Sequence, residues 1–272
     1  MRVVLVSLVS LVLVGCGRFG FDPGTGTLDA APRDAPPAGS YSAEVLADEP
    51  RVYYRLNEPA GDLVTFDASG NGFDGDYYID GGTLTLGTVG AIVSETDTAV
   101  RLVGGGNLDG TVSRVRFPPE AASWDADFTI EGWVRPELPP PMGWNSAFVI
   151  WEDYQVSGFR TGWNVNLVPV FWTDQGGVQS GIDSLTATTP LTENAWNHLI
   201  FTRMGGTVTI YLNGVSAAVG LVDFIRPGTA VNCVGSDQGV PSNATFDEVA
   251  LYPHALTAAR VAAHYAAGRR AP

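Results

Sequence analysis

Oxygen-bearing side chains recur at alternate positions of one short loop, in the run Asp67-Ala-Ser69-Gly-Asn71-Gly72. Aspartate, serine and asparagine supply the oxygen ligands that Ca²⁺ collects, and glycine permits the sharp turn of such loops. Tyr78 occupies the position at which a helix–loop–helix calcium site needs its bidentate glutamate, so that motif is absent. The alternative is an Asx-turn, in which the same side chains bond their own backbone.

Aromatic residues gather in the middle of the chain, at Trp144, Trp151, Tyr154, Trp163 and Trp172. Several aromatic faces exposed together can form a platform for sugar rings, because each ring offers a large apolar surface. Trp151 and Trp172 lie beside polar turn residues and Tyr154 follows closely, so we expect these three at the surface as ligand-binding residues. The alternative is that they pack in the core, as alternation predicts for Trp163.

The carboxylates and histidines form no recognisable catalytic set. Glu152 and Asp153 are neighbours at a predicted strand end, so their side chains should point to opposite faces. Glu131 stands alone, whereas the two carboxyl groups of a retaining glycosidase face each other about 5 Å apart. The three histidines form no His-Glu-x-x-His motif, and no Gly-x-Ser-x-Gly occurs. We therefore predict that the protein is not an enzyme.

The first sixteen residues have the layout of an export signal. One basic residue, Arg2, precedes the apolar run 3–14, which is shorter than the roughly 20 residues that span a bilayer. Leu13-Val-Gly-Cys16 resembles a bacterial lipobox, which predicts lipidation of Cys16 and a lipid-anchored, extracytoplasmic place in the cell envelope, at the outer membrane or the cell surface. The alternatives are an uncleaved anchor and a soluble export signal. Cys233 is then expected to be a buried, inert thiol.

Composition excludes some partners and indicates the fold class. The chain has 272 residues, of which 45% are hydrophobic, with Gly 33 and Pro 18, a balance typical of turn-rich β proteins. All fifteen basic residues are arginine, and the net charge is −14. An acidic chain without a basic stripe is a poor partner for nucleic acid, whose binding depends on neutralising phosphates.

A β-hairpin is the clearest predicted element. Gly205-Gly206 separates two runs that alternate apolar and polar residues, as in a two-residue hairpin turn. The fold-back predicts three cross-strand pairs: Arg203 with Val208, Phe201 with Ile210, and Leu199 with Leu212. Asn213-Gly214 then turns the chain into a third strand, 215–219. One face of this meander is apolar and needs a second layer of structure to bury it.

The domain organisation follows from the remaining patterns. Residues 17–40 read as a disordered Pro/Gly-rich spacer, 41–268 as one folded domain, and 269–272 as a tail. The only predicted helix is 256–267, with Thr257 and Gly268 as its caps and His264 exposed. We predict an all-β fold: a two-sheet antiparallel jelly-roll sandwich with one short C-terminal helix.

Four stretches carry a resemblance to a known family: Ala195-Trp-Asn-His-Leu-Ile-Phe-Thr-Arg with the hairpin that follows, Asp67-Ala-Ser-Gly-Asn-Gly, Phe128-Thr-Ile-Glu-Gly-Trp-Val-Arg-Pro, and Phe246-Asp-Glu-Val-Ala-Leu-Tyr. Together they resemble the laminin-G-like jelly-roll domains of the concanavalin A-like lectin/glucanase superfamily. The resemblance implies a structural Ca²⁺ shared by Asp67 and Asp247, with Asn71 as a further candidate ligand. In the glucanases of this superfamily, the catalytic carboxylates belong to a Glu-x-Asp-x-x-Glu motif. That motif is absent from this sequence.

Two functions from different classes fit these observations. The first is a membrane-tethered, lectin-like binding module that recognises a glycan or a protein partner. The second is a structural or adhesion lipoprotein of the envelope that binds no sugar. A third, weaker alternative is a glycoside hydrolase whose site the motifs do not reveal.

Overall fold

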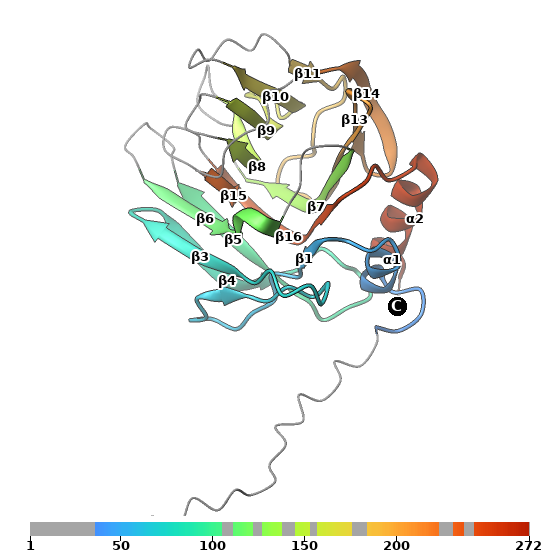
Figure 1. Cartoon of the computed structure of the whole chain (residues 1–272). Coiled ribbons are helices and arrows are strands. Elements are labelled where there is room, and N and C mark those ends of the chain that lie inside the picture. Colours follow the sequence, from blue (N-terminus) through green and yellow to red (C-terminus); the bar gives the residue numbers. More distant parts are fainter. Residues whose placement is uncertain are drawn as a thin grey trace, which may run out of the picture. The chain divides into compact units, whose positions relative to one another are not determined.

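Two antiparallel β-sheets of eight strands each pack face to face, and two helices lie against one of them (Figure 1). The computed structural model describes residues 36–104, 111–121, 127–137, 145–152, 157–175, 184–222, 231–236 and 242–271. The prediction of a two-sheet jelly-roll sandwich is confirmed. Cys16 and the spacer residues up to 35 lie outside the described ranges.

Sheet A contains the predicted meander at one edge. Its strand order is β14 (Val215–Leu221), β13 (Thr207–Leu212), β12 (Asn197–Met204), β7 (Phe128–Pro136), β16 (Ser242–Tyr252), β5 (Thr98–Gly104) and β4 (Thr83–Val89), with β1 (Val52–Tyr54) also paired to β16. The three predicted hairpin pairs are all present between β12 and β13. Gly205 and Gly206 both have positive φ, at 56° and 87°, as the tight turn requires.

Sheet B forms the second layer. Its order is β11 (Ser184–Thr186), β10 (Pro169–Gln175), β9 (Ser157–Trp163), β8 (Ser146–Glu152), β15 (Val231–Gly235), β6 (Val112–Arg116), β3 (Gly75–Asp80) and β2 (Val64–Thr65). A single 3₁₀ turn, η1 (Pro119–Ala121), follows β6.

Aromatic rings fill the space between the two sheets. Phe128 of sheet A stacks on Phe159 of sheet B at a centroid distance of 5.2 Å, and Phe159 stacks on Phe171 at 5.2 Å. All three rings are fully buried. Stacked rings add to the stability that burial of their apolar surface already provides.

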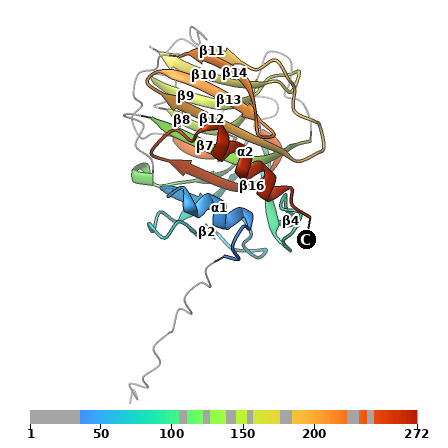
Figure 2. The same ribbon diagram turned by 90° about the vertical axis from the view of Figure 1, so that its right-hand side faces the viewer.

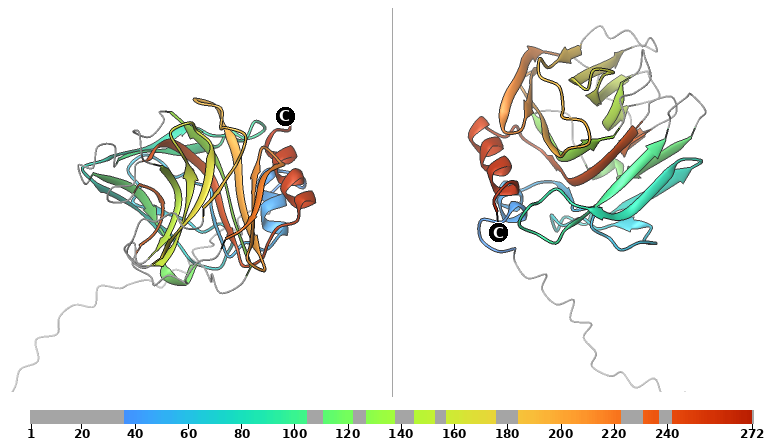
Figure 3. Two further views of the ribbon diagram at one scale, coloured as in Figure 1. Left: turned by 90° about the horizontal axis from the view of Figure 1, so that it is seen from above. Right: turned by 180° about the vertical axis from the view of Figure 1, so that it is seen from behind.

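Two helices cover the outer face of sheet A (Figures 2 and 3). They are α1 (Tyr41–Ala47) and α2 (Ala258–Gly268). Thr257 caps α2 as predicted, and its hydroxyl accepts a hydrogen bond from the amide of Arg260. Helix α1, whose start is capped by Ser40, was not predicted from the sequence. Neither of these two described helices is long and apolar enough to cross a membrane.

A buried polar network attaches both helices to sheet A, with Glu131 of β7 at its centre. Its carboxylate accepts hydrogen bonds from the hydroxyls of Tyr41 (2.9 Å) and Tyr252 (2.6 Å). It also accepts from Nε2 of His198 (2.8 Å) and Nδ1 of His264 (2.9 Å). The expectation that His264 is exposed is wrong, because this side of α2 faces the carboxylate of Glu131 and the ring is fully buried.

The first and last elements of the described chain also bind each other. Arg260 of α2 donates to Glu44 in the first turn of α1 (2.9 Å) and to Asp48, the C-cap of α1 (2.7 Å). Asp48 also accepts from Nε2 of His264 (2.9 Å). Arg270, just after α2, donates to the carbonyl of Gly39 (2.6 Å). The two ends of the folded domain are therefore neighbours.

Candidate functional site

The structure separates the three aromatic residues singled out as ligand-binding candidates. Trp151 on β8 is only 3% exposed, belongs to the core between the sheets and stacks on Phe117 at 5.5 Å. The expected surface position is therefore wrong for Trp151, because its side chain points into the sandwich. Tyr154 lies outside the described residues. Trp172 on β10 points to the opposite side from the core residue Phe171, but it too is buried, at 9% exposed, so the expected exposed position is also wrong for Trp172.

Trp172 belongs to a row of side chains on the outer face of sheet B, the face turned away from sheet A. Successive strands place its members opposite one another in the register: Trp172, Arg160, Ile150, Cys233, Arg116 and Asp76. Their neighbours along each strand, such as Phe159 and Phe171, lie in the core, which fixes the direction of the row. Cys233 is fully buried, as expected.

Tyr78 forms the aromatic centre of the β3–β6 end of this face. The guanidinium carbon of Arg116 lies 4.4 Å from the centre of the Tyr78 ring, and that of Arg114 lies 5.1 Å away. Asp76 accepts two hydrogen bonds from Arg116, at 2.9 Å from Nε and 2.6 Å from Nη2. Arg116 and Asp76 are nearly half exposed. The group therefore offers a ring, cationic donors and a carboxylate acceptor to solvent in fixed positions.

The Tyr78 group was not predicted from the sequence. The sequence does show that Asp76 and Tyr78, two residues apart on one strand, share a face. The same holds for Arg114 and Arg116 on another strand. These strands pair across about forty residues of chain, so the alternation alone could not bring the two pairs together. Both helices pack on sheet A, and neither covers the Tyr78 group.

The loop singled out for calcium is held by bonds to its own surroundings. Asp67 accepts backbone hydrogen bonds from Tyr53 (3.0 Å) and Ser69 (2.9 Å) through Oδ1 and from Phe73 (3.0 Å) through Oδ2. The side-chain nitrogen of Asn71 donates to the carbonyl of Arg51 (3.0 Å). The bond from the amide of Ser69 to Asp67, two residues apart, is that of an Asx-turn, the alternative to a calcium loop.

Asp247 lies in a different environment, at a bulge of β16 where the register with β7 shifts. Its Oδ2 accepts from the backbone amide of Ala91 (2.6 Å), while its Oδ1 is buried without a hydrogen-bond partner in the described part of the chain. Burial and the nearby charge of Asp97 raise the pKa of Asp247 well above its ordinary value. An orphaned buried carboxylate oxygen is costly, so this position favours a cation.

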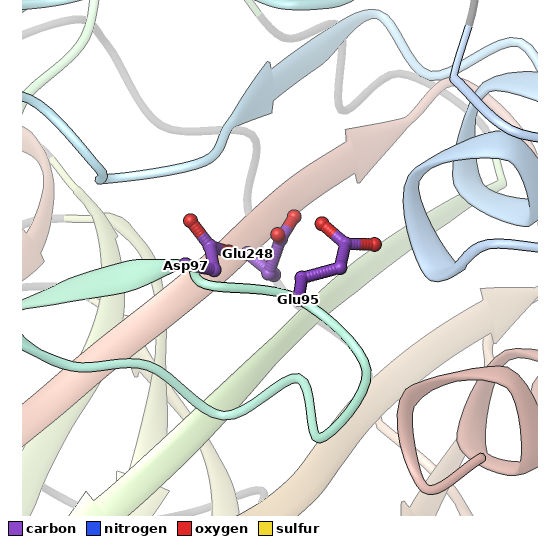
Figure 4. Close-up of side chains that lie close together, drawn as sticks. All are labelled: Glu95, Asp97 and Glu248. Carbon is purple, nitrogen blue, oxygen red and sulfur yellow. The ribbon is translucent and has the colours of Figure 1, made fainter. Parts of the chain in front are cut away.

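An acidic cluster lies beside Asp247, whose pKa responds to the charge of Asp97. The cluster consists of Glu95 and Asp97, from the segment before β5, and Glu248 of β16 (Figure 4), and one oxygen of each lies within 4.8 Å of the others. Arg55 donates through Nη2 to all three, at 2.5 Å, 3.2 Å and 3.0 Å respectively. Glu248 also accepts a hydrogen bond from the hydroxyl of Tyr53.

The acidic cluster has more negative charge than Arg55 can neutralise. Burial raises the pKa of Glu248 well above its usual range, against the lowering effect of Arg55, and a hydrogen bond with Asp97 raises it further. Carboxylate oxygens this close together are the ligands that Ca²⁺ prefers. The residues around Asp247 therefore fit a calcium ion better than the Asp67 loop does. Among the described residues, Asp67 belongs to no group of three His, Cys, Asp or Glu side chains close enough to hold one metal ion.

Comparison with known proteins identifies similar sequences and folds. A family model described as the concanavalin A-like lectin/glucanases superfamily matches residues 108–262. No curated protein matches the sequence.

Solved structures of low sequence identity have the same fold. Domain 4 of an extracellular arabinanase from Geobacillus stearothermophilus, solved in complex with arabinotriose, is 20% identical with a TM-score of 0.58; the match covers 80% of this chain and 98% of that domain. The binding domain of botulinum neurotoxin DC, solved in complex with SialylT, is 15% identical with a TM-score of 0.58, over 82% of this chain and 52% of that one. Trypanosoma rangeli sialidase is 12% identical with a TM-score of 0.53, over 79% and 32%. The chain thus spans about half of the toxin domain and a third of the sialidase.

Proposed function

Because the chain belongs to the concanavalin A-like lectin/glucanase superfamily, we propose that it is a carbohydrate-binding module and not an enzyme. We propose that it lies in the bacterial cell envelope, outside the cytoplasm, attached to the membrane by a lipid on Cys16. The lipobox-like run supports this location. The similar domains solved with arabinotriose and with SialylT support a glycan as the kind of partner. A protein partner is the second option, and a structural or adhesion role without sugar binding is the third.

The single observation that carries this proposal is the Tyr78 group on the outer face of sheet B. Arginine donors and the carboxylate of Asp76 are the groups that hydrogen-bond sugar hydroxyls, and an aromatic ring packs against the C–H face of a sugar. Rigid strands hold these side chains, so binding requires little reordering of the protein.

Truncating the aromatic centre of this face should weaken glycan binding. We expect Tyr78→Ala to lower affinity about tenfold or more, because truncating an aromatic side chain at the centre of a binding site costs about 2 kcal/mol or more, and tenfold corresponds to about 1.4 kcal/mol. Tyr78→Phe keeps the ring and should bind nearly as well as the wild type. The measurement is a broad glycan array with the full chain, followed by titration of the best glycan.

Other outcomes of the same experiment would redirect the proposal. If wild-type protein binds a glycan and Tyr78→Ala binds it equally, the site lies elsewhere, and Trp172→Ala is the next variant. If no glycan binds but an envelope protein is captured, the protein-partner option replaces the glycan. If neither occurs, the structural role stands.

The proposal that the protein is not an enzyme rests on how its close carboxylates are used. Glu95, Asp97 and Glu248 are near enough for a two-carboxylate mechanism. However, Glu248 is fully buried, the side chain of Asp97 is 1% exposed, and both bind Arg55. Glu131 is also fully buried and accepts hydrogen bonds from four side chains. We expect no release of reducing sugar from β-glucans, and such a release would revive the hydrolase alternative.

We further propose a structural Ca²⁺, held by Glu95, Asp97 and Glu248 beside Asp247. Calcium would supply positive charge where the carboxylates now exceed the charge of Arg55. At a hundredfold excess over its dissociation constant, a ligand of the native state adds about 2.7 kcal/mol of stability. The melting midpoint should then rise by about 5–10 °C relative to chelator, at about 2–4 °C per kcal/mol.

A pair of variants separates this site from the Asp67 loop. Asp97→Asn should abolish the response of the melting midpoint to calcium, whereas Asp67→Asn should keep it. The reverse result would assign the calcium to Asp67 and Asn71. An identical midpoint in calcium and in chelator for the wild type would end the calcium proposal.

A further inference from the structure

A cavity lies at the corner where α1 ends and β1 begins. Its volume is about 410 Å³, within the usual range of small-ligand sites. The residues that line it come from the last turn of α1, the α1–β1 link, the Asp67 loop and the position after β16: Leu46, Glu49, Pro50, Arg51, Ser69, Asn71 and Pro253. None of them belongs to the outer face of sheet B, so the cavity is separate from the Tyr78 group.

Glu49 occupies a backbone position that normally belongs to glycine. It follows the C-cap residue Asp48, its amide donates to the carbonyl of Leu46 (3.2 Å), and its φ is 50°. Helices commonly end with glycine in this left-handed conformation, because other residues are strained there. The Glu49 side chain is exposed and makes no hydrogen bond or ion pair among the described residues. Its carboxylate thus does nothing for the fold that would offset the strain. Such strain is typical of ligand-binding positions.

The neighbouring polar groups of the cavity are held in place. The side-chain nitrogen of Asn71 donates to Pro50 (3.1 Å), Arg51 (3.0 Å) and the hydroxyl of Ser69 (3.1 Å). These bonds fix the orientation of the amide, and its Oδ1 accepts no hydrogen bond within the described ranges. The cavity therefore presents two acceptors with open capacity, the carboxylate of Glu49 and the amide oxygen of Asn71.

Arg51 is the cationic residue among those that line the cavity, and its guanidinium is held in place. It donates to the carbonyl of Glu120 through Nε (3.0 Å) and Nη2 (2.7 Å), and its guanidinium stacks on the ring of Phe73 at 4.8 Å. Nη1 remains to donate, since no hydrogen bond of this atom occurs in the described part of the chain. The rings of Pro50 and Pro253 add rigid apolar walls.

This lining selects a ligand class by charge and by hydrogen bonding. The guanidinium of Arg51 opposes a bare cation, and the carboxylate of Glu49 opposes an anion. An apolar ligand would leave both acceptors without partners after driving out water, which is unfavourable. A neutral ring with several hydroxyl groups satisfies all three polar side chains, and its C–H face fits the proline walls.

We infer that this corner cavity is a second carbohydrate site, which binds one neutral sugar ring through Glu49, Arg51 and Asn71. The inference rests on the proposed function for the class of ligand, but not for the position of the site. The strained carboxylate of Glu49 is its main hydrogen-bond acceptor.

Glucose, galactose, mannose and arabinose, each titrated into the full chain, test the inference by ligand-observed NMR and calorimetry. Glu49→Gln and Glu49→Gly should weaken binding about tenfold or more. Glu49→Gly should also keep or raise the melting midpoint, because glycine accepts the positive φ. A residue with a merely structural role would lose stability instead. Glu193→Gln, which removes an exposed carboxylate outside the cavity, is the matched control and should change neither property.

Each outcome decides between the two sites. Binding lost in both Glu49 variants and retained in Tyr78→Ala supports the corner cavity. Unchanged sugar binding in both Glu49 variants overturns the corner site. If Tyr78→Ala abolishes this sugar binding, the proposed function is retained, with the Tyr78 group as its site. A lower melting midpoint of Glu49→Gly overturns the strain argument. The absence of binding to all four sugars overturns the corner site, while the glycan array decides the proposed function by itself.

Discussion

Replacing Glu131 with alanine should lower the free energy of unfolding by about 3–5 kcal/mol, the usual cost of breaking a buried charge pair from one side. The carboxylate is fully buried and accepts hydrogen bonds from two tyrosines and two histidines. Its removal leaves four donors facing a cavity. It also leaves the imidazolium of His264 with only Asp48 as a partner.

Chemical denaturation monitored by tryptophan fluorescence measures this loss. Glu137→Ala is the matched control, since Glu137 directly follows β7 and forms a partly exposed ion pair with Arg101 (2.6 Å). Such pairs contribute about 0–1 kcal/mol, so the control should differ little from the wild type. A loss below about 1 kcal/mol in Glu131→Ala would mean that the network does not hold the helices to sheet A.

Acidification should reduce the stability advantage of the wild type over Glu131→Gln. Burial alone would raise the pKa of Glu131, but the charge of His264 and hydrogen bonds from both histidines lower it far below 4.5. A lowered pKa gives stability that is present above the unfolded value and lost as pH falls toward the folded one. The advantage should therefore be large near pH 6 and shrink steadily below about pH 4.5.

The two histidines add pH dependences of opposite sign to the stability of the wild type. Burial lowers the pKa of His198, so its contribution is also lost as pH falls below 6.5. Burial would lower the pKa of His264 too, but the charge of Glu131 outweighs it and raises that pKa above 6.5. The contribution of His264 is complete below 6.5 and is lost as pH rises through its raised pKa.

Free energies of unfolding of wild type and Glu131→Gln, measured from pH 3 to pH 9, test this window. The difference between the two proteins should be greatest near neutral pH and smaller at both ends. A difference that is the same at pH 3 and pH 7 would show that Glu131 is not ionised in the folded protein.

Local patterns predicted the hairpin and the sandwich, because their evidence lies within short runs of sequence. The pairing of Phe201 with Ile210 depends only on a turn and on alternation. Alternation also predicted Trp163 in the core, and this is confirmed, because its ring is fully buried between the sheets. Helix α1 was missed because its seven residues carry too little periodic signal.

The candidate sites could be predicted only where one segment contains them. The bonding of Asp67 follows from its own loop, and the Asx-turn alternative described that bonding from the sequence. Asp247 belongs with Asp97 and Glu248, which a spacing pattern could not reveal because the segments meet only after folding. The network around Glu131 combines side chains from five separate segments. These segments meet only after folding, so Glu131 stood alone in the sequence.

The contact between Gly39 and Arg270 makes the domain a unit that another protein could carry inside one of its own loops. Because the first and last helices begin and end close together, a host protein could insert the domain between two neighbouring residues of a loop. No long linkers would be needed. The same closeness permits a circular permutant: a short linker would join the native ends, and the tight turn at Gly205-Gly206 would supply new ones.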